Sequence, residues 1–390
     1  MNEAWWVNEE DLDDEQKKVI ALGSEGNYLL IGPPGSGKTN LLLLRANYLT
    51  AGDKPDLVIL VFTRTLREFI AAGARRYLFS AGKVQTYVGW ARRLLAENGI
   101  EAPDSTSFQE ERQNLLSALK NLIERERITD DYYDAILLDE AHDYMEEEIE
   151  VIRTFSRNLF SVMDSRQQIY RKDPHAIEHL KSFSETIELP FHYRNGIQIC
   201  RLADQIMKGK AIYAPMEPTS HYNEAAKPSS VEHFDCTGDI EQQCEIAISK
   251  LETQLQAYPN ELLGVICPRH EEFEVIRSCL ERSSLSNLCV YQDAKYGYQP
   301  FDDDHPVCVS TVHGSKGLEF TALHILACDT FRDGFYTTNR NMTFTAVTRA
   351  KTSLSLYYSG EIYGYLQKAL AALAPRTDLP GLSEAFGRRR

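Results

Sequence analysis

The sequence has no apolar run that approaches the roughly 18 residues of a membrane span, so no contact with a membrane is expected. Its start, MNEAWWVNEEDLDDEQ, is acidic and does not show the basic and then apolar pattern of a secretory signal peptide. There is no CxxC pair and no zinc-like spacing, and the eight cysteines all lie between Cys200 and Cys328. We therefore expect buried thiols in a reducing cytoplasm.

The chain is also short of positive charge. It has 390 residues, with 42 Lys and Arg against 57 Asp and Glu, which gives a net charge of −15. Nucleic-acid binding normally depends on a cationic surface, so this balance argues against broad affinity for nucleic acid but allows a local basic groove. One local cluster fits a binding surface and solvated helix faces equally well. Its members are Arg64, Arg67, Arg75, Arg76, Lys83, Arg92 and Arg93.

Apolar strands alternate with helical segments along the chain. In the first half, strands are predicted at 28–31, 57–62, 135–138 and 158–163. The pattern restarts after about residue 187, with strands predicted at 231–236, 262–267, 307–311, 322–328 and 354–358. Strands that are apolar throughout and alternate with helices indicate parallel sheets covered on both faces. The fold class predicted is α/β, with two parallel-sheet domains.

A glycine-rich segment at 32–39 fits the phosphate-binding consensus GxxxxGK[ST] in full. It lies between a predicted strand and a predicted helix, the context that this motif requires. Lys38 is expected to neutralise β- and γ-phosphate oxygens, the Thr39 hydroxyl to face Mg²⁺, and the helix N-terminus to add its positive dipole. The residues predicted to bind nucleotide here are Gly32, Pro33, Gly35, Ser36, Gly37, Lys38, Thr39 and Asn40.

Two adjacent acids directly follow the predicted strand at 135–138. Asp139 is expected to hold the magnesium ion, and Glu140 to orient and deprotonate the attacking water. Two acids at a strand end would also fit a surface turn. In combination with the loop at 32–39 they favour hydrolysis of ATP with Mg²⁺ as cofactor.

Eight segments in order resemble the motifs of the UvrD/Rep/PcrA-like branch of superfamily 1 helicases. They are LDDEQ (12–16), VFTRTL (61–66), TYVGW (86–90), LLDEAHD (137–143), MDSRQQIY (163–170), FHYRN (191–195), STVHGSKGLEF (310–320) and FTAVTRAK (344–351). In that family these are the Q motif and motifs Ia, Ic, II, III, IV, V and VI. The resemblance implies two RecA-like domains with the ATP site in the cleft between them.

The same resemblance divides the chain. It implies an N-terminal domain 1A at 1–187 with a small helical 1B insertion at about 92–131, a domain 2A at 188–365, and a C-terminal tail at 366–390. Family members usually carry a large 2B insertion before motif V. Here the segment 293–307 is too short for a domain, so the chain is expected to be a reduced motor core.

The resemblance also implies roles at the nucleotide. Gln16 would contact adenine and Tyr193 would stack on it, while Glu319 would bind the ribose and Gly317 would allow close approach to phosphate. Gln167 would sense the γ-phosphate. Arg194 and Arg349 would reach the γ-phosphate from the second domain as arginine fingers, which couples hydrolysis to domain closure.

Four residues match the family's nucleic-acid contacts: Phe62, Thr63, Thr86 and His313. Core packing would also explain Phe62, and a structural role would also explain His313. Three positions depart from the family. The stacking Trp that usually follows motif III is replaced by the sequence 171–173 (RKD), the usual His of motif Ic is replaced by Val88, and His142 stands where Gln is more frequent.

The function implied is that of an ATP-dependent translocase or helicase on single-stranded DNA, moving 3′ to 5′, with RNA open as a substrate. The alternative is a regulatory ATPase subunit beside a protein partner such as a nuclease. Short UvrD-like subunits of this kind occur in anti-phage defence systems, of which Gabija is one. The negative charge, the reduced insertions and the missing stacking residue favour this alternative.

Overall fold

The structure is a computed structural model that describes residues 12–373 apart from 127, 165–173, 211–212 and 332–338. Its strands are β1 (Tyr28–Ile31), β2 (Leu57–Val61), β3 (Val84–Thr86), β4 (Ala135–Leu138), β5 (Leu159–Met163), β6 (Glu185–Glu188), β7 (Ser230–Asp235), β8 (Leu263–Cys267), β9 (Cys289–Asp293), β10 (Gly297–Tyr298), β11 (Val307–Thr311), β12 (Phe320–Ile325) and β13 (Ala350–Tyr358). Its α-helices are α1 (Asp14–Ile20), α2 (Lys38–Ala51), α3 (Arg64–Gly73), α4 (Tyr87–Glu97), α5 (Phe108–Glu126), α6 (Glu146–Arg153), α7 (Pro174–Phe183), α8 (Ile197–Met207), α9 (Ile240–Ala257), α10 (His270–Glu281), α11 (Asn339–Val347) and α12 (Gly364–Leu373).

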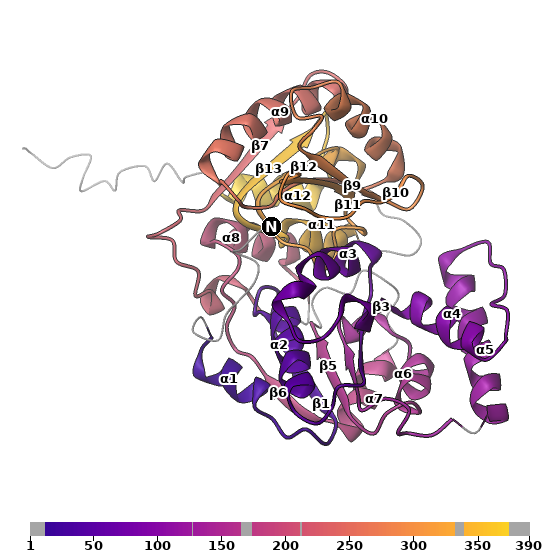
Figure 1. Cartoon of the computed structure of the whole chain (residues 1–390). Helices are drawn as coiled ribbons and strands as arrows, with labels where there is room; N and C mark the ends of the chain where they lie inside the picture. Colours follow the sequence, from indigo (N-terminus) through magenta and orange to yellow (C-terminus); the bar gives the residue numbers. More distant parts are fainter. Residues whose placement is uncertain (1–11, 127, 165–173, 211–212, 332–338, 374–390) are drawn as a thin grey trace, which may run out of the picture.

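The strands form two sheets, and each sheet is the centre of one lobe (Figure 1). The first lobe has the strand order β3-β2-β4-β5-β1-β6, and the second has β10-β9-β11-β8-β12-β13-β7. The pairs within the first sheet are parallel, and so are those of the second sheet apart from the β9–β10 hairpin. The predicted fold class, α/β with two parallel-sheet domains, is confirmed.

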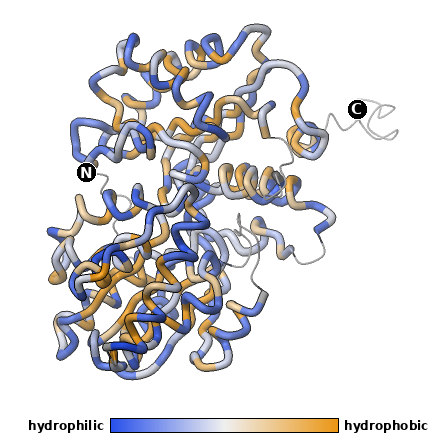
Figure 2. The backbone as a smooth tube through the Cα atoms, turned by 90° about the vertical axis from the view of Figure 1, so that its right-hand side faces the viewer, coloured by the Kyte–Doolittle hydropathy of each residue, from blue (hydrophilic) through white to orange (hydrophobic). Residues whose placement is uncertain are grey.

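Alternate residues of a buried strand face opposite helical layers. In β2, Val58 and Leu60 belong to the cluster formed with α4, α5, α6 and α7, whereas Leu57, Ile59 and Val61 face α2 and α3. Each sheet is therefore covered on both faces, and the apolar stretches of the backbone lie inside both lobes (Figure 2). This double burial explains why these strands read as unbroken apolar runs.

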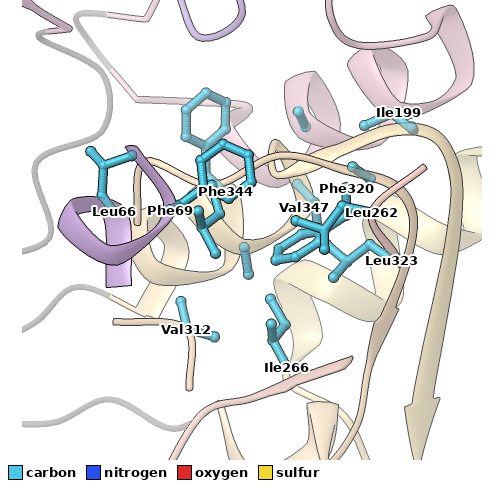
Figure 3. Close-up of a cluster of buried hydrophobic side chains, with 14 of the residues drawn as sticks. Leu66, Phe69, Ile199, Leu262, Ile266, Val312, Phe320, Leu323, Phe344 and Val347 are labelled. Atoms are coloured by element: carbon cyan, nitrogen blue, oxygen red, sulfur yellow. The ribbon is translucent and has the colours of Figure 1, made fainter. Parts of the chain in front are cut away.

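Helix α3 belongs to the first lobe but packs against the second. Leu66 and Phe69 lie beside Phe344 and other apolar side chains of the second lobe (Figure 3). The Phe69 ring meets the ring of Phe301 edge-on, at 5.2 Å between centroids. One apolar cluster thus continues from the first sheet to the second.

The structure shows what lies at the two positions where members of the resembled family carry the 1B and 2B insertions. Helices α4 and α5 project from the side of the first lobe as a pair (Figure 1), so the region expected as a helical insertion at about 92–131 contains the end of α4 and the whole of α5, joined by the non-helical residues 98–107. In the second lobe, the segment between β9 and β11, residues 294–306, has the two-residue strand β10 as its regular secondary structure. No 2B-like domain stands between these strands.

Two strands of the first sheet were not predicted. β3 has three residues, and β6 (ETIE) is mostly exposed at the edge of the sheet beside β1, so neither has an apolar run to reveal it. Cysteines are buried as expected, except Cys279, which is half-buried. Among the described helices, none is both long and apolar enough to cross a membrane.

Candidate ATP site and nucleic-acid groove

The glycine-rich loop lies between β1 and α2, as the motif requires. Gly35 and Gly37 have φ angles of 80° and 82°, the left-handed region that favours glycine. A Cβ on Gly35 would lie 2.6 Å from the Cβ of Arg194, and the backbone N–H of Tyr193 donates to the Gly35 carbonyl at 3.0 Å. The glycine therefore lets the segment that connects the lobes pass directly over the loop.

The predicted magnesium ligands lie together at the end of β4. The Thr39 hydroxyl donates to Asp139 Oδ2 at 3.2 Å, and the N–H of Glu140 donates to Asp139 Oδ1 at 3.0 Å. A hydroxyl and a carboxylate oxygen are the kind of donors that Mg²⁺ takes beside a phosphate. The residues present therefore fit the ion that the resemblance implies.

Lys38 points back into its own loop. Its Nζ donates to the carbonyls of Gly32 at 2.8 Å and Pro33 at 2.7 Å. Desolvation lowers the pKa of this half-buried amine. Only about 20 Å³ of cavity remains where the γ-phosphate would lie. The walls of this cavity, which we call the phosphate cavity, include Gly35, Lys38, Thr39, Asp139, Glu140, Asp164, Arg194, Gly317 and Arg349.

Both predicted arginine fingers reach the phosphate cavity. Arg349 is 2% exposed and donates to the carbonyls of Thr345 and Leu318, both at 3.3 Å. Burial and the neighbouring charge of Arg194 lower the pKa of Arg349 to about 10. Arg194 forms an ion pair with Glu319. The carboxylate predicted to bind ribose is therefore paired with a predicted arginine finger, and both roles remain predictions.

Glu140 is held in an electropositive surrounding. Burial alone would raise its pKa, but the charges of Lys316 and Arg349 lower it to about 2. Burial, followed by the charge of Glu140, raises the pKa of Asp139 instead. The charges of Lys316 and Arg349 therefore favour the ionised form of Glu140, which is the form that a general base needs.

His142 lies beside the predicted base. The backbone N–H of Asp164 donates to His142 Nδ1 at 3.2 Å, so the ring proton of the neutral imidazole is on Nε2. That nitrogen is 3.4 Å from Glu140 Oε2. Burial lowers the pKa of His142, which keeps the ring neutral.

A second cavity of about 400 Å³ lies beside the loop and has the residues expected for an adenine site. Gln16 accepts from the N–H of Asp13 at 3.1 Å and donates to the Ser36 carbonyl at 3.2 Å. The Tyr193 hydroxyl donates to the Asp13 carboxylate. Gln16 and Tyr193, far apart in sequence, line the same cavity as predicted.

Two aromatic residues of this cavity were not predicted. Phe191 and His221 stack with their ring centroids 4.0 Å apart, and the Tyr193 ring meets His221 edge-on at 5.7 Å. Phe191 was within a recognised motif but had no role assigned to it. His221 lies between α8 and β7, in a loop without a motif, so no sequence signal pointed to it.

A third cavity of about 500 Å³, here called the groove, is lined by both lobes and by the α4–α5 pair. All four residues predicted to contact nucleic acid line it: Phe62, Thr63, Thr86 and His313. Both threonines also cap helices, since Thr63 Oγ1 accepts from the N–H of Leu66 at 3.2 Å and Thr86 Oγ1 from that of Gly89 at 3.1 Å.

Phe62 is half-buried and packed on its edges. Its ring lies 6.2 Å from Phe108 and 5.9 Å from Tyr144, both at 80°, and the Arg112 guanidinium is 5.4 Å from its centroid. Phe62 is therefore part of the packing of the groove wall and also lines the groove. Gln167 and residues 171–173 lie outside the described residues, so their predicted roles stay predictions.

Comparisons with known proteins agree with this arrangement. Residues 13–170 match the family model of the DEAD/DEAH box helicases, and residues 306–357 match that of the UvrD-like helicase C-terminal domain. The first match contains the loop, Asp139 and Glu140, and the second contains His313, Gly317, Glu319 and Arg349. No curated protein sequence matches the chain.

A solved structure titled as the C-terminal domain of a possible DNA helicase from Lactobacillus plantarum WCFS1 is 17% identical. It covers 46% of this chain and 96% of its own, and its TM-score of 0.32 is too low to carry an argument. Fold and site define a two-lobed helicase-type ATPase. The two family matches support a UvrD-like helicase, with the UvrD-like match itself limited to residues 306–357.

Proposed function

We propose that this enzyme hydrolyses ATP between its lobes to move along single-stranded DNA, with 3′ to 5′ polarity as in the family that it resembles. One observation carries the proposal: a single loop of the second lobe, residues 313–319, lies on both the groove and the phosphate cavity. His313 lines the groove, whereas Gly317 lines the phosphate cavity. A displacement of this loop therefore changes both sites together.

The loop is also tied to the first lobe. Lys316 and Asp143, each 1% exposed at the side chain, form an ion pair across the lobes. The Thr63 hydroxyl, on the groove, donates to the Lys316 carbonyl at 3.1 Å. These contacts support direct coupling between a strand in the groove and the carboxylates that follow β4.

The proposed hydrolysis uses groups already in place. Lys38 would exchange its bonds to loop carbonyls for phosphate oxygens, and Glu140 would accept the proton of the attacking water. Arg194 and Arg349 would stabilise the charge of the transition state. Mg²⁺, held by Thr39 and Asp139, would neutralise phosphate charge when bound.

The test is the ATPase rate of the purified chain with and without an oligo-dT strand. We expect DNA to raise the rate, and the double variant Lys316→Met/Asp143→Asn, which removes both buried charges together, to lose this stimulation while it still binds ATP. Absence of both binding and stimulation by single strands would reject the proposal. Stimulation by RNA alone would assign RNA as the substrate.

A second candidate is a regulatory ATPase subunit in the cytoplasm that acts beside a nuclease, as in anti-phage systems. The small β9–β11 connection and the pairing of groove cations with carboxylates favour it. Unwinding of a tailed duplex by the isolated chain would support the motor. Unwinding or cleavage that appears only with a co-purifying partner would support the subunit.

A further inference from the structure

We infer that the groove holds a single strand mainly by stacking its bases on Phe108 and Tyr298, with few contacts to phosphate. This inference rests on the proposed function, because it names how the same groove grips its substrate. The two aromatic residues lie outside the recognised motifs, one in the α4–α5 pair and one in the β9–β10 hairpin. Both line the groove.

Phe108 is the first residue of α5, and it is 48% exposed. The edge contact with Phe62 and the Arg112 guanidinium, 5.8 Å from the Phe108 centroid, fix the ring on its inner side. The rest of the ring faces the groove. A large apolar ring that is positioned but left open to solvent has the properties of a stacking platform, which accepts any base.

Tyr298 stands on the other lobe. It is half-buried in β10, and the guanidinium of Arg64 lies 5.8 Å from its ring centroid. The strand would thus be held by one aromatic residue from each lobe. Because relative movement of the lobes changes the separation of these two rings, such an arrangement can release one base and take the next.

The cations of the groove are largely neutralised by neighbouring acids. Arg92 pairs with Glu111 at 2.7 Å, and Arg112 Nε donates to Glu148 at 2.8 Å. On the opposite wall, His270 Nδ1 lies 2.7 Å from the carboxylate of Asp293. Arg64 also lines the groove, and among the described residues it forms no ion pair; its guanidinium lies near the Tyr298 ring.

This balance leaves stacking as the main source of affinity. For single strands, the slope of log affinity against log salt is about −0.7 for each phosphate that a cation neutralises. With Arg64 as the main phosphate contact, we expect a slope of about −0.7, the value for one neutralised phosphate. A strand held by many lysines and arginines would show a slope several times steeper.

The experiment is fluorescence anisotropy on the full chain, with labelled oligo-dT and an abasic strand of equal length. We expect Phe108→Ala and Tyr298→Ala each to weaken oligo-dT binding by about 5- to 150-fold, the range for loss of one stacked base. Binding to the abasic strand and ATP turnover without DNA should stay unchanged. Phe108→Trp should bind oligo-dT at least as tightly as the wild type.

Tyr48→Ala is the matched control, since Tyr48 is also 48% exposed but lies on α2, away from the groove. Three results would overturn the inference: oligo-dT affinity unchanged in both alanine variants, equal losses on the abasic strand, or a steep salt slope. If wild-type chain shows no response to any single strand, the proposed function fails instead. The two failures are therefore distinguishable.

Discussion

The phosphate cavity and the groove cross the same two lobes, but they are built in opposite ways. About 20 Å³ is open in the phosphate cavity, against about 500 Å³ in the groove. In the cavity, Lys38 and Arg349 donate to backbone carbonyls and Arg194 pairs with Glu319. ATP must therefore replace internal bonds, whereas a strand has only to enter an open groove. The variants below test this contrast from the largest expected effect to the smallest.

Replacement of Arg349 by Ala should have the largest effect. Its guanidinium is the buried cation of the second lobe in the phosphate cavity, so kcat should fall by about 10³–10⁵, the scale of an arginine finger. Steady-state ATP hydrolysis is the measurement, with Arg201→Ala, in an exposed ion pair, as control. An unchanged kcat would contradict the prediction that the second lobe supplies a residue needed for ATP hydrolysis.

Glu140→Gln should lower kcat by about 10²–10⁴, because the amide cannot accept the proton of water. Binding of ATP, measured by titration with a fluorescent analogue, should persist because the shape of the side chain is kept. Glu147→Gln, an exposed glutamate paired with Lys120, is the control. Turnover close to the wild-type rate would show that another residue is the base.

Gly317→Ala and Gly297→Ala compare the borders of the two sites. Both glycines have positive φ, 85° and 92°, but an added Cβ would lie 2.5 Å from Leu66 Cδ2 at Gly317 and would meet nothing within 4 Å at Gly297. Backbone strain is common to both, so Gly317→Ala should cost about 1–3 kcal/mol more through overpacking. Urea denaturation measures this difference. Equal losses in the free energy of unfolding would show that the Leu66 side chain moves aside at little cost.

Glu111→Gln should have the smallest effect. It frees the Arg92 guanidinium for phosphate, so oligo-dT binding should strengthen a few-fold and the salt slope should become steeper by about 0.7. Affinity across a salt series is the measurement. Glu281→Gln, which breaks an exposed pair with Arg277 in the second lobe, is the control. A slope that stays constant would mean that Arg92 does not reach the strand.

The ATP half of the site could be predicted well from the sequence. Residues of the loop at 32–39, Asp139, Glu140, Arg194, Gly317 and Arg349 all line one cavity, although they come from five separate segments. The loop, Asp139 and Glu140 could be identified because each belongs to a short pattern whose chemistry is fixed by phosphate and Mg²⁺, whereas Arg194, Gly317 and Arg349 were implied by the resemblance to the helicase motifs. Their roles in turnover stay predictions until the variants are measured.

The remaining residues depend on pairings between distant segments, which no local pattern contains. Lys316 and Asp143 both lie inside recognised motifs, but their separation of 173 residues gave no reason to pair them. Phe108 reads as an ordinary first residue of a helix. Only the fold shows that its ring is open to the groove and that Arg112 forms an ion pair with Glu148.

The position of α3 determines whether the two lobes can fold separately. Since Leu66 and Phe69 complete the apolar cluster of the second lobe, a cut after β6 would leave each half with an uncovered apolar face. We expect the halves to aggregate when expressed separately and the intact chain to melt in one transition. The shared apolar cluster therefore makes the two lobes one cooperative folding unit, even if hydrolysis requires them to move relative to one another.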